Sequence, residues 1–149
     1  MKNNNIKIKF NELVIQSRTD NLTKIREFVY SAAKQAGASK EVIEDIILAV
    51  DEAITNIIKH AYKLYPEGKI FVKIKYTAKI FTVVITDYGI PLESSKVKKP
   101  DIRKYCRQHK IGGLGMYLMK TLMDEVKYTS VPGKYNQVLL TKNLNTSSR

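Results

Sequence analysis

The stretch SKEVIEDIILAVDEAITNIIKHAY, from Ser39 to Tyr62, organises the rest of the chain. Ser39 is a favourable N-cap residue, and acidic residues follow it near the positive end of the helix dipole. The apolar residues recur at helical spacing: Val42, Ile43, Ile46, Ile47, Val50, Ile54, Ile57 and Ile58. The stretch therefore predicts an amphipathic helix with one face in the core.

The same helix carries polar residues on one side. Glu52, Asn56 and His60 are each separated by four residues, so an acid, a carboxamide and an imidazole project from a single face. Polar residues on an amphipathic helix are usually solvated surface positions. Two glycine-bearing stretches further along the chain favour a binding face instead.

Both stretches combine glycine with a change of secondary structure. In ITDYGIP, Ile85 to Pro91, an alternating apolar strand ends at Asp87 and a glycine turn follows. In GGLGMYLMKTLMDEV, Gly112 to Val126, a glycine-rich loop is expected to open into a helix. Such an arrangement directs free backbone N–H groups at an anion.

Taken in order, Glu52, Asn56, Asp87, Gly89 and the Gly112-Gly113-Leu114-Gly115 loop resemble the nucleotide-binding boxes of the ATPase superfamily shared by gyrase, histidine kinases and mismatch-repair ATPases. Within that superfamily the chain resembles the small bacterial anti-sigma-factor serine kinases, through LAVDEAITNIIKHAY, DYGIP, GGLGMYLMKTLMDEV and the closing VLLTK. The likeness runs through almost all of the chain after Ser39. It implies an α+β fold: a two-layer α/β sandwich of the histidine-kinase-like ATPase type, with a mixed, mainly antiparallel sheet and helices on one face.

Length and composition are those of one globular domain. The 149 residues, 44% of them hydrophobic, suffice for a core, so we expect a single domain over residues 1–149. No apolar run is long enough to span a membrane and no charged-then-apolar leader opens the chain, which favours a cytoplasmic protein without membrane contact. The single cysteine, Cys106, is interpreted as an incidental thiol.

The net charge of +12 raises the alternative of a nucleic-acid-binding domain. The lysines, however, are spread along the chain, and only Lys96 to Lys110 forms a dense basic group. The chain has no RNA-binding aromatic signature and no zinc-finger spacing. Direct nucleic-acid binding therefore ranks well below a nucleotide site.

Alternation and turn residues predict the remaining elements. The first are an edge strand over Asn5–Phe10, with Ile6, Ile8 and Phe10 buried, and a helix from Asp20 or Asn21 to about Gln35 that Gly37 ends. The later ones are strands Lys69–Tyr76 and Ile80–Thr86, a helix Leu114–Asp124, and strands Val126–Ser130 and Gln137–Thr141. Asn143–Arg149 is expected to be a frayed tail.

The segment from about residue 93 to 111 lacks periodicity and is basic. Long irregular segments inside compact domains are usually functional lids or disordered loops. We expect an ATP lid here, with a solvated mobile loop as the alternative.

Recognition of ATP requires different groups at its two ends. Asp87 is the expected acceptor for the exocyclic amine of adenine, which guanine's carbonyl would not satisfy, and Gly89 allows close backbone approach. The alternative for Asp87 is a simple strand-ending turn residue. For the phosphates, we expect N–H donors from Gly112, Gly113, Leu114, Gly115 and Met116, and positive charge from Lys110 with Arg107 as a helper.

The helix face carries the expected chemistry. Magnesium prefers hard oxygen ligands and keeps several waters, so Asn56 together with the triphosphate suffices as its protein ligand. Glu52, one turn earlier, would accept the proton of an incoming hydroxyl. His60 has two interpretations, a phosphate contact or a structural histidine.

Two positions depart from the usual family pattern. Pro91 replaces the second glycine of the Asp-x-Gly-x-Gly box, which fixes a torsion and removes a donor. Tyr135-Asn136 replaces a Gly-Thr pair whose threonine reaches adenine in the family. Asn136 can both donate and accept, so a role in adenine recognition is retained.

The function implied by the resemblance is an ATP- and magnesium-dependent anti-sigma factor and protein serine/threonine kinase. It would sequester a sigma factor, phosphorylate a serine on an anti-anti-sigma antagonist and form a homodimer. The alternative is a catalytically silent module that binds ATP and partner proteins, in which Asp87 and the glycines are needed but Glu52 is dispensable.

Overall fold

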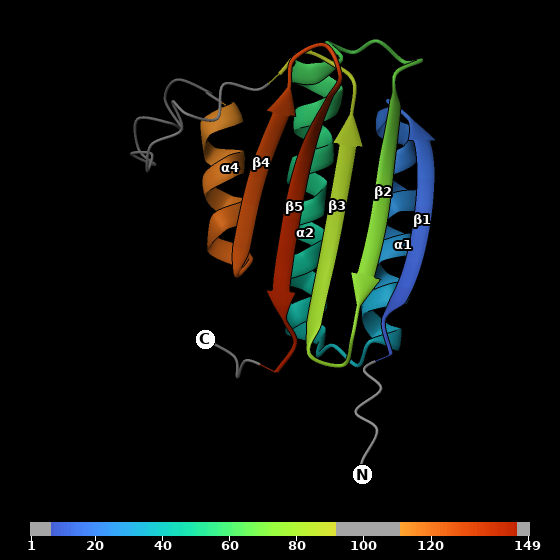
Figure 1. Cartoon of the computed structure of the whole chain (residues 1–149), viewed down its shortest axis with the longest axis vertical. Coiled ribbons are helices and arrows are strands. Elements are labelled where there is room, and N and C mark those ends of the chain that lie inside the picture. Colours follow the sequence, from blue (N-terminus) through green and yellow to red (C-terminus); the bar gives the residue numbers. More distant parts are fainter. Residues whose placement is uncertain (1–6, 92–110, 146–149) are drawn as a thin grey trace.

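The computed structural model describes residues 7–91 and 111–145, and within the second range it describes side chains from residue 115 onward. Five strands form one sheet in the order β1-β2-β3-β5-β4, and each described pair is antiparallel. The strands are β1 (Lys9–Gln16), β2 (Lys69–Tyr76), β3 (Ile80–Asp87), β4 (Glu125–Val131) and β5 (Tyr135–Asn143) (Figure 1). The predicted hairpin over β2 and β3 is therefore confirmed, as is the closing hairpin, whose strands are longer than expected.

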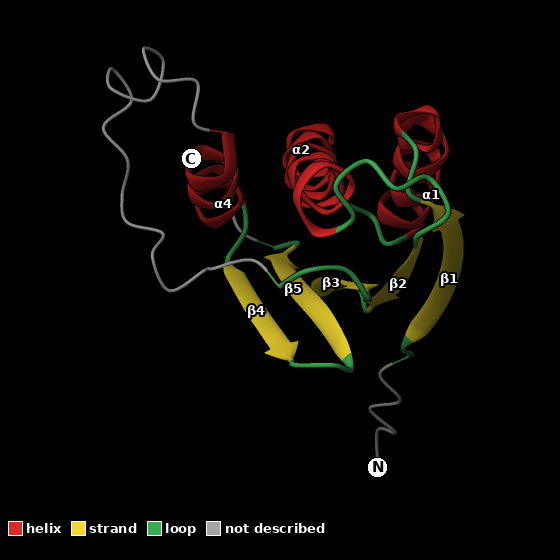
Figure 2. Ribbon diagram, turned by 90° about the horizontal axis from the view of Figure 1, so that it is seen from above, coloured by secondary structure: helices red, strands yellow, loops and turns green. Residues whose placement is uncertain are grey.

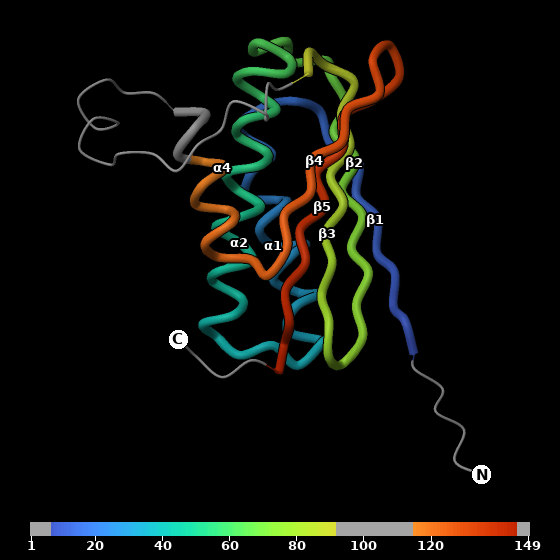
Figure 3. Tube along the Cα trace, turned by 60° about the vertical axis from the view of Figure 1, so that its left-hand side comes forward, coloured from blue at the N-terminus to red at the C-terminus, as the bar shows by residue number. Residues whose placement is uncertain are grey.

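Three helices cover one face of this sheet in the described part of the chain (Figure 2). They are α1 (Leu22–Gln35), α2 (Lys40–Asn56) and α4 (Ile111–Leu122), and α2 lies between the other two. The side view shows the helices and the sheet as two separate layers (Figure 3). The expected two-layer α+β sandwich with helices on one face is confirmed, and each described strand pair is antiparallel where a mixed, mainly antiparallel sheet was expected.

The core lies between the two layers. Ile70, Val72 and Ile74 alternate inward along β2 and are almost fully buried. They belong to one hydrophobic cluster that also contains Ile46 and Ile54 of α2. Because a strand's side chains alternate between faces, this burial fixes which groups at the strand ends point toward the helices.

The first strand is not where the sequence predicted it. Residues 1–6 lie outside the described part, and β1 spans Lys9–Gln16 instead of Asn5–Phe10. Ile8 and Phe10, expected inside, are 51% and 58% exposed, whereas Ile15 is buried. Both segments alternate, but the pairing of Ile15 with Ile70 selects the later one.

Two other boundaries also differ. Asn143, assigned from sequence to a frayed tail, is the last residue of β5, and the N–H of Leu144 donates to Lys79 O at 2.8 Å. The helix predicted from Leu114 begins earlier, at Ile111.

The expected lid over residues 93–111 lies, except for Ile111, outside the described residues. Within the ranges 7–91 and 111–145, no helix is both long and apolar enough to cross a membrane.

Candidate active site

The central helix ends in a widened turn beside the site. Ser39 Oγ accepts a hydrogen bond from Val42 N at 3.3 Å and caps α2 as predicted. After Asn56 the chain continues as a π-helical turn, Ile57–Ala61, closed by the bond from Tyr62 N to Ile57 O at 2.9 Å. Turns of this kind are rare and occur frequently at functional sites.

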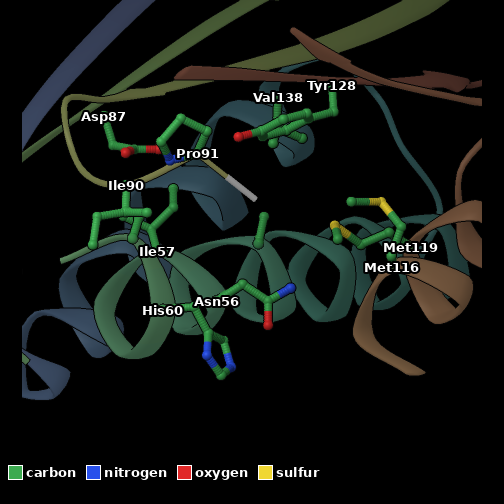
Figure 4. Close-up of a pocket in the computed structure, with 12 residues that line it drawn as sticks. Asn56, Ile57, His60, Asp87, Ile90, Pro91, Met116, Met119, Tyr128 and Val138 are labelled. Carbon is green, nitrogen blue, oxygen red and sulfur yellow. The ribbon is translucent and has the colours of Figure 1, made fainter. Parts of the chain in front are cut away.

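The polar face predicted on this helix is present, with different burial at each position. Asn56 is 6% exposed, Glu52 is half-buried, and His60, in the π turn, is exposed. Figure 4 shows the side chains of Asn56 and His60 on the same side of the helix. His60 therefore lies at the mouth of the site.

The buried carboxamide of Asn56 is unsatisfied. Neither its Oδ1 nor its Nδ2 has a hydrogen-bond partner among the described residues, although both atoms are inaccessible to solvent. Burying a polar group without a partner costs about 1–3 kcal/mol in proteins. An unpaired carboxamide at the wall of a pocket is therefore a candidate ligand-binding group.

Helix α4 brings the glycine-rich segment against this carboxamide. A Cβ added to Gly115 would lie 2.9 Å from Glu52 Oε2 and 3.2 Å from Asn56 Nδ2. A side chain at this position would push the ends of Glu52 and Asn56 aside, so glycine leaves both polar side chains undisturbed between the two helices. The acid, the carboxamide and the glycine segment thus meet at one place.

The glycine-rich segment is not the loop that the sequence predicted. Gly112, Gly113 and Leu114 lie in the first turn of α4, which begins at Ile111. Each glycine lowers helix propensity by about 1 kcal/mol relative to alanine, but tertiary packing overrides that preference. The N–H groups of a first helical turn have no intrahelical acceptor, so donors for an anion are still available there.

Asp87 ends β3 on the inner face of the sheet and is 3% exposed. Its Oδ1 accepts two hydrogen bonds, one from Gly89 N and one from Asn136 Nδ2, each at 2.9 Å. Among the described residues, Oδ2 receives none. Burial raises the pKa of Asp87 above its usual range, and the bonds from Asn136 and Gly89 partly oppose that increase.

Gly89 is required by the protein's own backbone. A Cβ on Gly89 would overlap with the carbonyl group of Ala61 at the end of the π turn. The next residue, Ile90, donates its N–H to Ala61 O at 2.7 Å. The close approach that the sequence suggested at Gly89 is therefore made to α2's extension, and it fixes the Asp87 turn against that extension.

A pocket of about 110 Å³ lies between these elements (Figure 4). Four residues predicted for the site line it: Asn56, His60, Asp87 and Met116. The other lining residues are Ala53, Ile57, Ala61, Ile90, Pro91, Met119, Tyr128 and Val138. The sequence reasoning missed the walls from β4 and β5, although the alternation of those strands places Tyr128 and Val138 inward.

Pro91, noted from sequence as a departure, is part of the pocket wall. Figure 4 shows its ring beside the carboxylate of Asp87. Its rigid ring contributes apolar surface where the family pattern has a flexible residue. Pro91 thus contributes to the shape of the pocket.

Tyr62, which the sequence does not single out, connects three segments of the chain through contacts of its hydroxyl and its ring. Its hydroxyl donates to Lys69 O at 2.6 Å and accepts from Tyr88 N at 2.9 Å. A Cβ on Gly68 would lie 2.5 Å from the tyrosine ring. Partial burial raises the pKa of Tyr62 above its usual range.

Asn136, the second departure from the family pattern, donates a hydrogen bond from its Nδ2 to Asp87 Oδ1. Its Nδ2 also donates to Gly89 O at 2.9 Å, and its Oδ1 accepts from Ser130 Oγ at 2.8 Å.

The predicted phosphate ligands Lys110 and Arg107 lie outside the described residues. In the described ranges no cluster of three or more His, Cys, Asp or Glu could hold a metal ion, so a metal here would depend on few protein ligands.

Comparison with known proteins agrees with this geometry. The family described as "Histidine kinase-like ATPase domain" matches residues 15–142. The serine-protein kinase RsbW of Bacillus subtilis is 33% identical over 150 residues, covering 97% of this chain and 90% of the relative. RsbW of Listeria monocytogenes is 38% identical over 117 residues, covering 76% of this chain and 73% of the relative.

Solved structures show the same fold at lower identity. The RsbU and RsbW domains of a Mycobacterium tuberculosis protein match with a TM-score of 0.68 and 16% identity, covering 95% of this chain and 34% of that one. The SiaB–SiaC complex from Pseudomonas aeruginosa matches with a TM-score of 0.54 and 15% identity, covering 88% and 89%. At these identities the likeness concerns the fold alone.

Proposed function

The chain belongs to the histidine kinase-like ATPase family, and from that premise we propose that its pocket binds ATP with the base over Asp87 and the phosphates between α2 and the first turn of α4. The observation that carries the proposal is the buried, unpaired carboxamide of Asn56 beside Gly115. The carboxamide is buried without a partner, and Gly115 beside it leaves it undisturbed. A bound phosphate and its cation would explain both features.

Magnesium fits the residues present. Asn56 Oδ1 is a hard oxygen without a protein partner among the described residues, and a single protein oxygen is enough for an ion that keeps waters and phosphate oxygens as ligands. When bound, the ion would neutralise charge on the phosphates. Lys110 and the basic segment of residues 93–111 would add positive charge from the lid.

The chain is a protein serine kinase, as its relatives' names indicate. We assign Glu52 as the general base, because it lies one helical turn from Asn56 and against Gly115. Glu52 would accept the proton of the substrate serine as the serine oxygen bonds to the γ-phosphorus and ADP leaves. His60, exposed at the mouth, would contact phosphate.

Binding of the whole nucleotide requires movement of α4. The pocket of about 110 Å³ is smaller than the roughly 300–1,000 Å³ of typical small-molecule sites. Even one Cβ added to Gly115 would lie within 3.2 Å of Glu52 and Asn56, so little space is left between the two helices there. The first turn of α4 would therefore move away from α2 to admit the triphosphate, while the base occupies the existing cavity.

The proposed partners follow from the family. The kinase would sequester a sigma factor in the cytoplasm, act as a homodimer and phosphorylate a serine of an anti-anti-sigma antagonist. A single domain over residues 1–149 is supported by the family match over residues 15–142 and by the one hydrophobic cluster among the described residues, and the lid is proposed near residues 93–111.

The test is transfer of label from ATP to a purified candidate antagonist. The wild-type protein should transfer phosphate in the presence of magnesium, and Glu52→Ala should reduce transfer by at least about 100-fold while ATP affinity stays within about threefold. The matched control is Glu44→Ala, which removes an exposed acid two turns earlier on the same helix.

The outcomes distinguish the alternatives. Unchanged transfer by Glu52→Ala would remove Glu52 as the base. A wild-type protein that binds ATP and the antagonist but transfers no label would be a catalytically silent binding module. Absence of ATP binding would refute the site itself.

A further inference from the structure

We propose that Ser130 is a specificity-determining residue for the nucleotide base, because it fixes the amide of Asn136 and, through it, the carboxylate of Asp87. The inference rests on the proposed function, in that it assumes a purine nucleotide over Asp87. It assigns a role to a residue on β4 that no sequence motif marks.

The three side chains form a chain of hydrogen bonds across the inner end of the sheet. Ser130 and Asn136 are directly opposite each other in the β4–β5 pairing, and Asn136 is opposite Asp87 in the β3–β5 pairing. Ser130 Oγ lies 2.8 Å from Asn136 Oδ1, and Asn136 Nδ2 lies 2.9 Å from Asp87 Oδ1. Asn136 and Asp87 are each 3% exposed, so water does not replace these bonds easily.

The orientation of the Asn136 amide is determined by chemistry. Its Nδ2 lies 2.9 Å from Gly89 O and 2.9 Å from Asp87 Oδ1, and a carbonyl and an ionised carboxylate can only accept. The amide must therefore direct its NH₂ group at both. Its oxygen then faces β4, where Ser130 supplies the matching O–H donor.

This orientation decides which atom of Asp87 is free. Oδ1 is occupied by Asn136 Nδ2 and Gly89 N, whereas Oδ2 accepts no hydrogen bond from the described residues. Asp87 lines the pocket, so a carboxylate acceptor is available to a ligand amine. The exocyclic amine of adenine satisfies this acceptor, while the carbonyl oxygen at the same position of guanine repels it.

Removal of the Ser130 hydroxyl would weaken this selection. Asn136 Oδ1 would lose its donor in a largely buried position, and the two orientations of the amide would become closer in free energy. In the flipped orientation an amide oxygen would face Asp87, and the carboxylate would turn away from that repulsion. Selection for adenine would fall, whereas binding of the phosphates would be unaffected.

The experiment compares Ser130→Val with Ser130→Thr, which have the same shape and differ in the hydroxyl. Each variant and the wild-type protein are titrated with ATP, GTP and purine riboside triphosphate, which lacks the exocyclic amine. The control is Thr129→Val, at an exposed position on the outer face of the same strand.

The expected result is a change in selectivity. Ser130→Val should lower ATP affinity about five- to tenfold and leave affinity for purine riboside triphosphate within about twofold, so that the ratio of the two falls. Ser130→Thr should keep the wild-type ratio, as should Thr129→Val. The ratio of ATP to GTP affinity should fall in Ser130→Val as well.

Two results would overturn the inference. A wild-type ratio in Ser130→Val would show that the hydroxyl does not act on the base, and an equal loss for all three nucleotides would show a structural role only. A wild-type protein that binds none of the three would refute the proposed function as well, which is a different observation from an ATP-binding protein whose selectivity is independent of Ser130.

Discussion

The two ends of the pocket differ in whether their polar groups are hydrogen-bonded within the protein. At the end that we propose for the base, both polar side-chain atoms of Asn136 and one oxygen of Asp87 are hydrogen-bonded within the protein. At the end that we propose for the phosphates, the carboxamide of Asn56 is buried with no partner among the described residues, and Gly115 lies against it. The base end is preorganised, whereas the phosphate end has polar groups that the protein itself does not satisfy.

This difference indicates how the site divides its tasks. Preorganised groups recognise a fixed shape at low entropic cost, which suits a rigid purine ring. Unsatisfied groups lower the stability of the protein and are retained where a ligand satisfies them. Selectivity should therefore depend on the base end, and magnesium dependence and catalysis should depend on the phosphate end.

Asp87→Asn should have the largest effect, because it breaks the base end. The amide would retain an oxygen for Gly89 N and Asn136 Nδ2 but present an NH₂ group to the amine of adenine. We expect ATP affinity to fall about 100-fold, measured by fluorescence titration. The control is Asp20→Asn, which changes an exposed aspartate far from Asp87 in the sequence. Wild-type affinity in Asp87→Asn would show that adenine binds elsewhere.

Gly115→Ala tests the phosphate end without removing a polar group. The added Cβ would displace Glu52 and Asn56 by a few tenths of an ångström, as judged from the distances of 2.9 and 3.2 Å. Label transfer should fall about tenfold, since small displacements of reacting groups are costly. The melting temperature should be unchanged or higher, because alanine favours the helix more than glycine does.

Its control is Lys120→Ala, which changes an exposed residue of the same helix. Loss of folding together with loss of transfer would contradict the interpretation, because it would mean that the glycine is needed for packing alone.

Asn56→Leu should sharpen the contrast by making the phosphate end more stable. Leucine has the same number of side-chain heavy atoms and removes the unpaired carboxamide, so the free energy of unfolding should rise by about 1 kcal/mol. That corresponds to roughly 2–4 °C in melting temperature for a chain of this size. The same variant should lose the magnesium dependence of ATP affinity. A less stable variant would show that the carboxamide is paired in the free protein.

The pH dependence of stability should give the smallest effect. Burial raises the pKa of Asp87 in the folded protein above its unfolded value. Folding therefore favours the protonated acid, and this contribution to stability is present below the unfolded pKa and is lost as pH rises through the folded pKa. Unfolding titrations from weakly acidic to neutral pH should show wild type losing stability relative to Asp87→Asn. A constant difference would mean that the pKa is not raised.

Much of the fold follows from periodicity. The spacing of Ile25, Val29 and Ala32 predicts α1, and the alternation of Ile70, Val72 and Ile74 predicts β2, because in both cases a single face is strongly apolar. The position of the first strand was predicted wrongly, because the sequence there does not single out one apolar segment. Residues on either side of Lys9 alternate equally well, and only the contact of Leu13 and Ile15 with β2 decides between them.

The sequence predicts positions at the pocket best where a single residue type has a clear chemical role. Asp87, Asn56 and Met116 line the pocket as expected, and Glu52 lies against Gly115. The support for these groups was not predictable, because it depends on register between distant strands. Ser130 is a partner of Asn136 only because β4 pairs with β5 so that the two are opposite.

The π turn at the end of α2 determines which backbone carbonyl faces the Asp87 turn. Its extra width carries the carbonyl of Ala61 to the N–H of Ile90, so the length of the chain between Ile57 and Ala61 is fixed by a docking contact. Deleting one residue there would restore ordinary helical winding and rotate that carbonyl away from the Asp87 turn. A deletion in the Thr77–Lys79 connection, at the far end of the sheet, would leave the same contact in place.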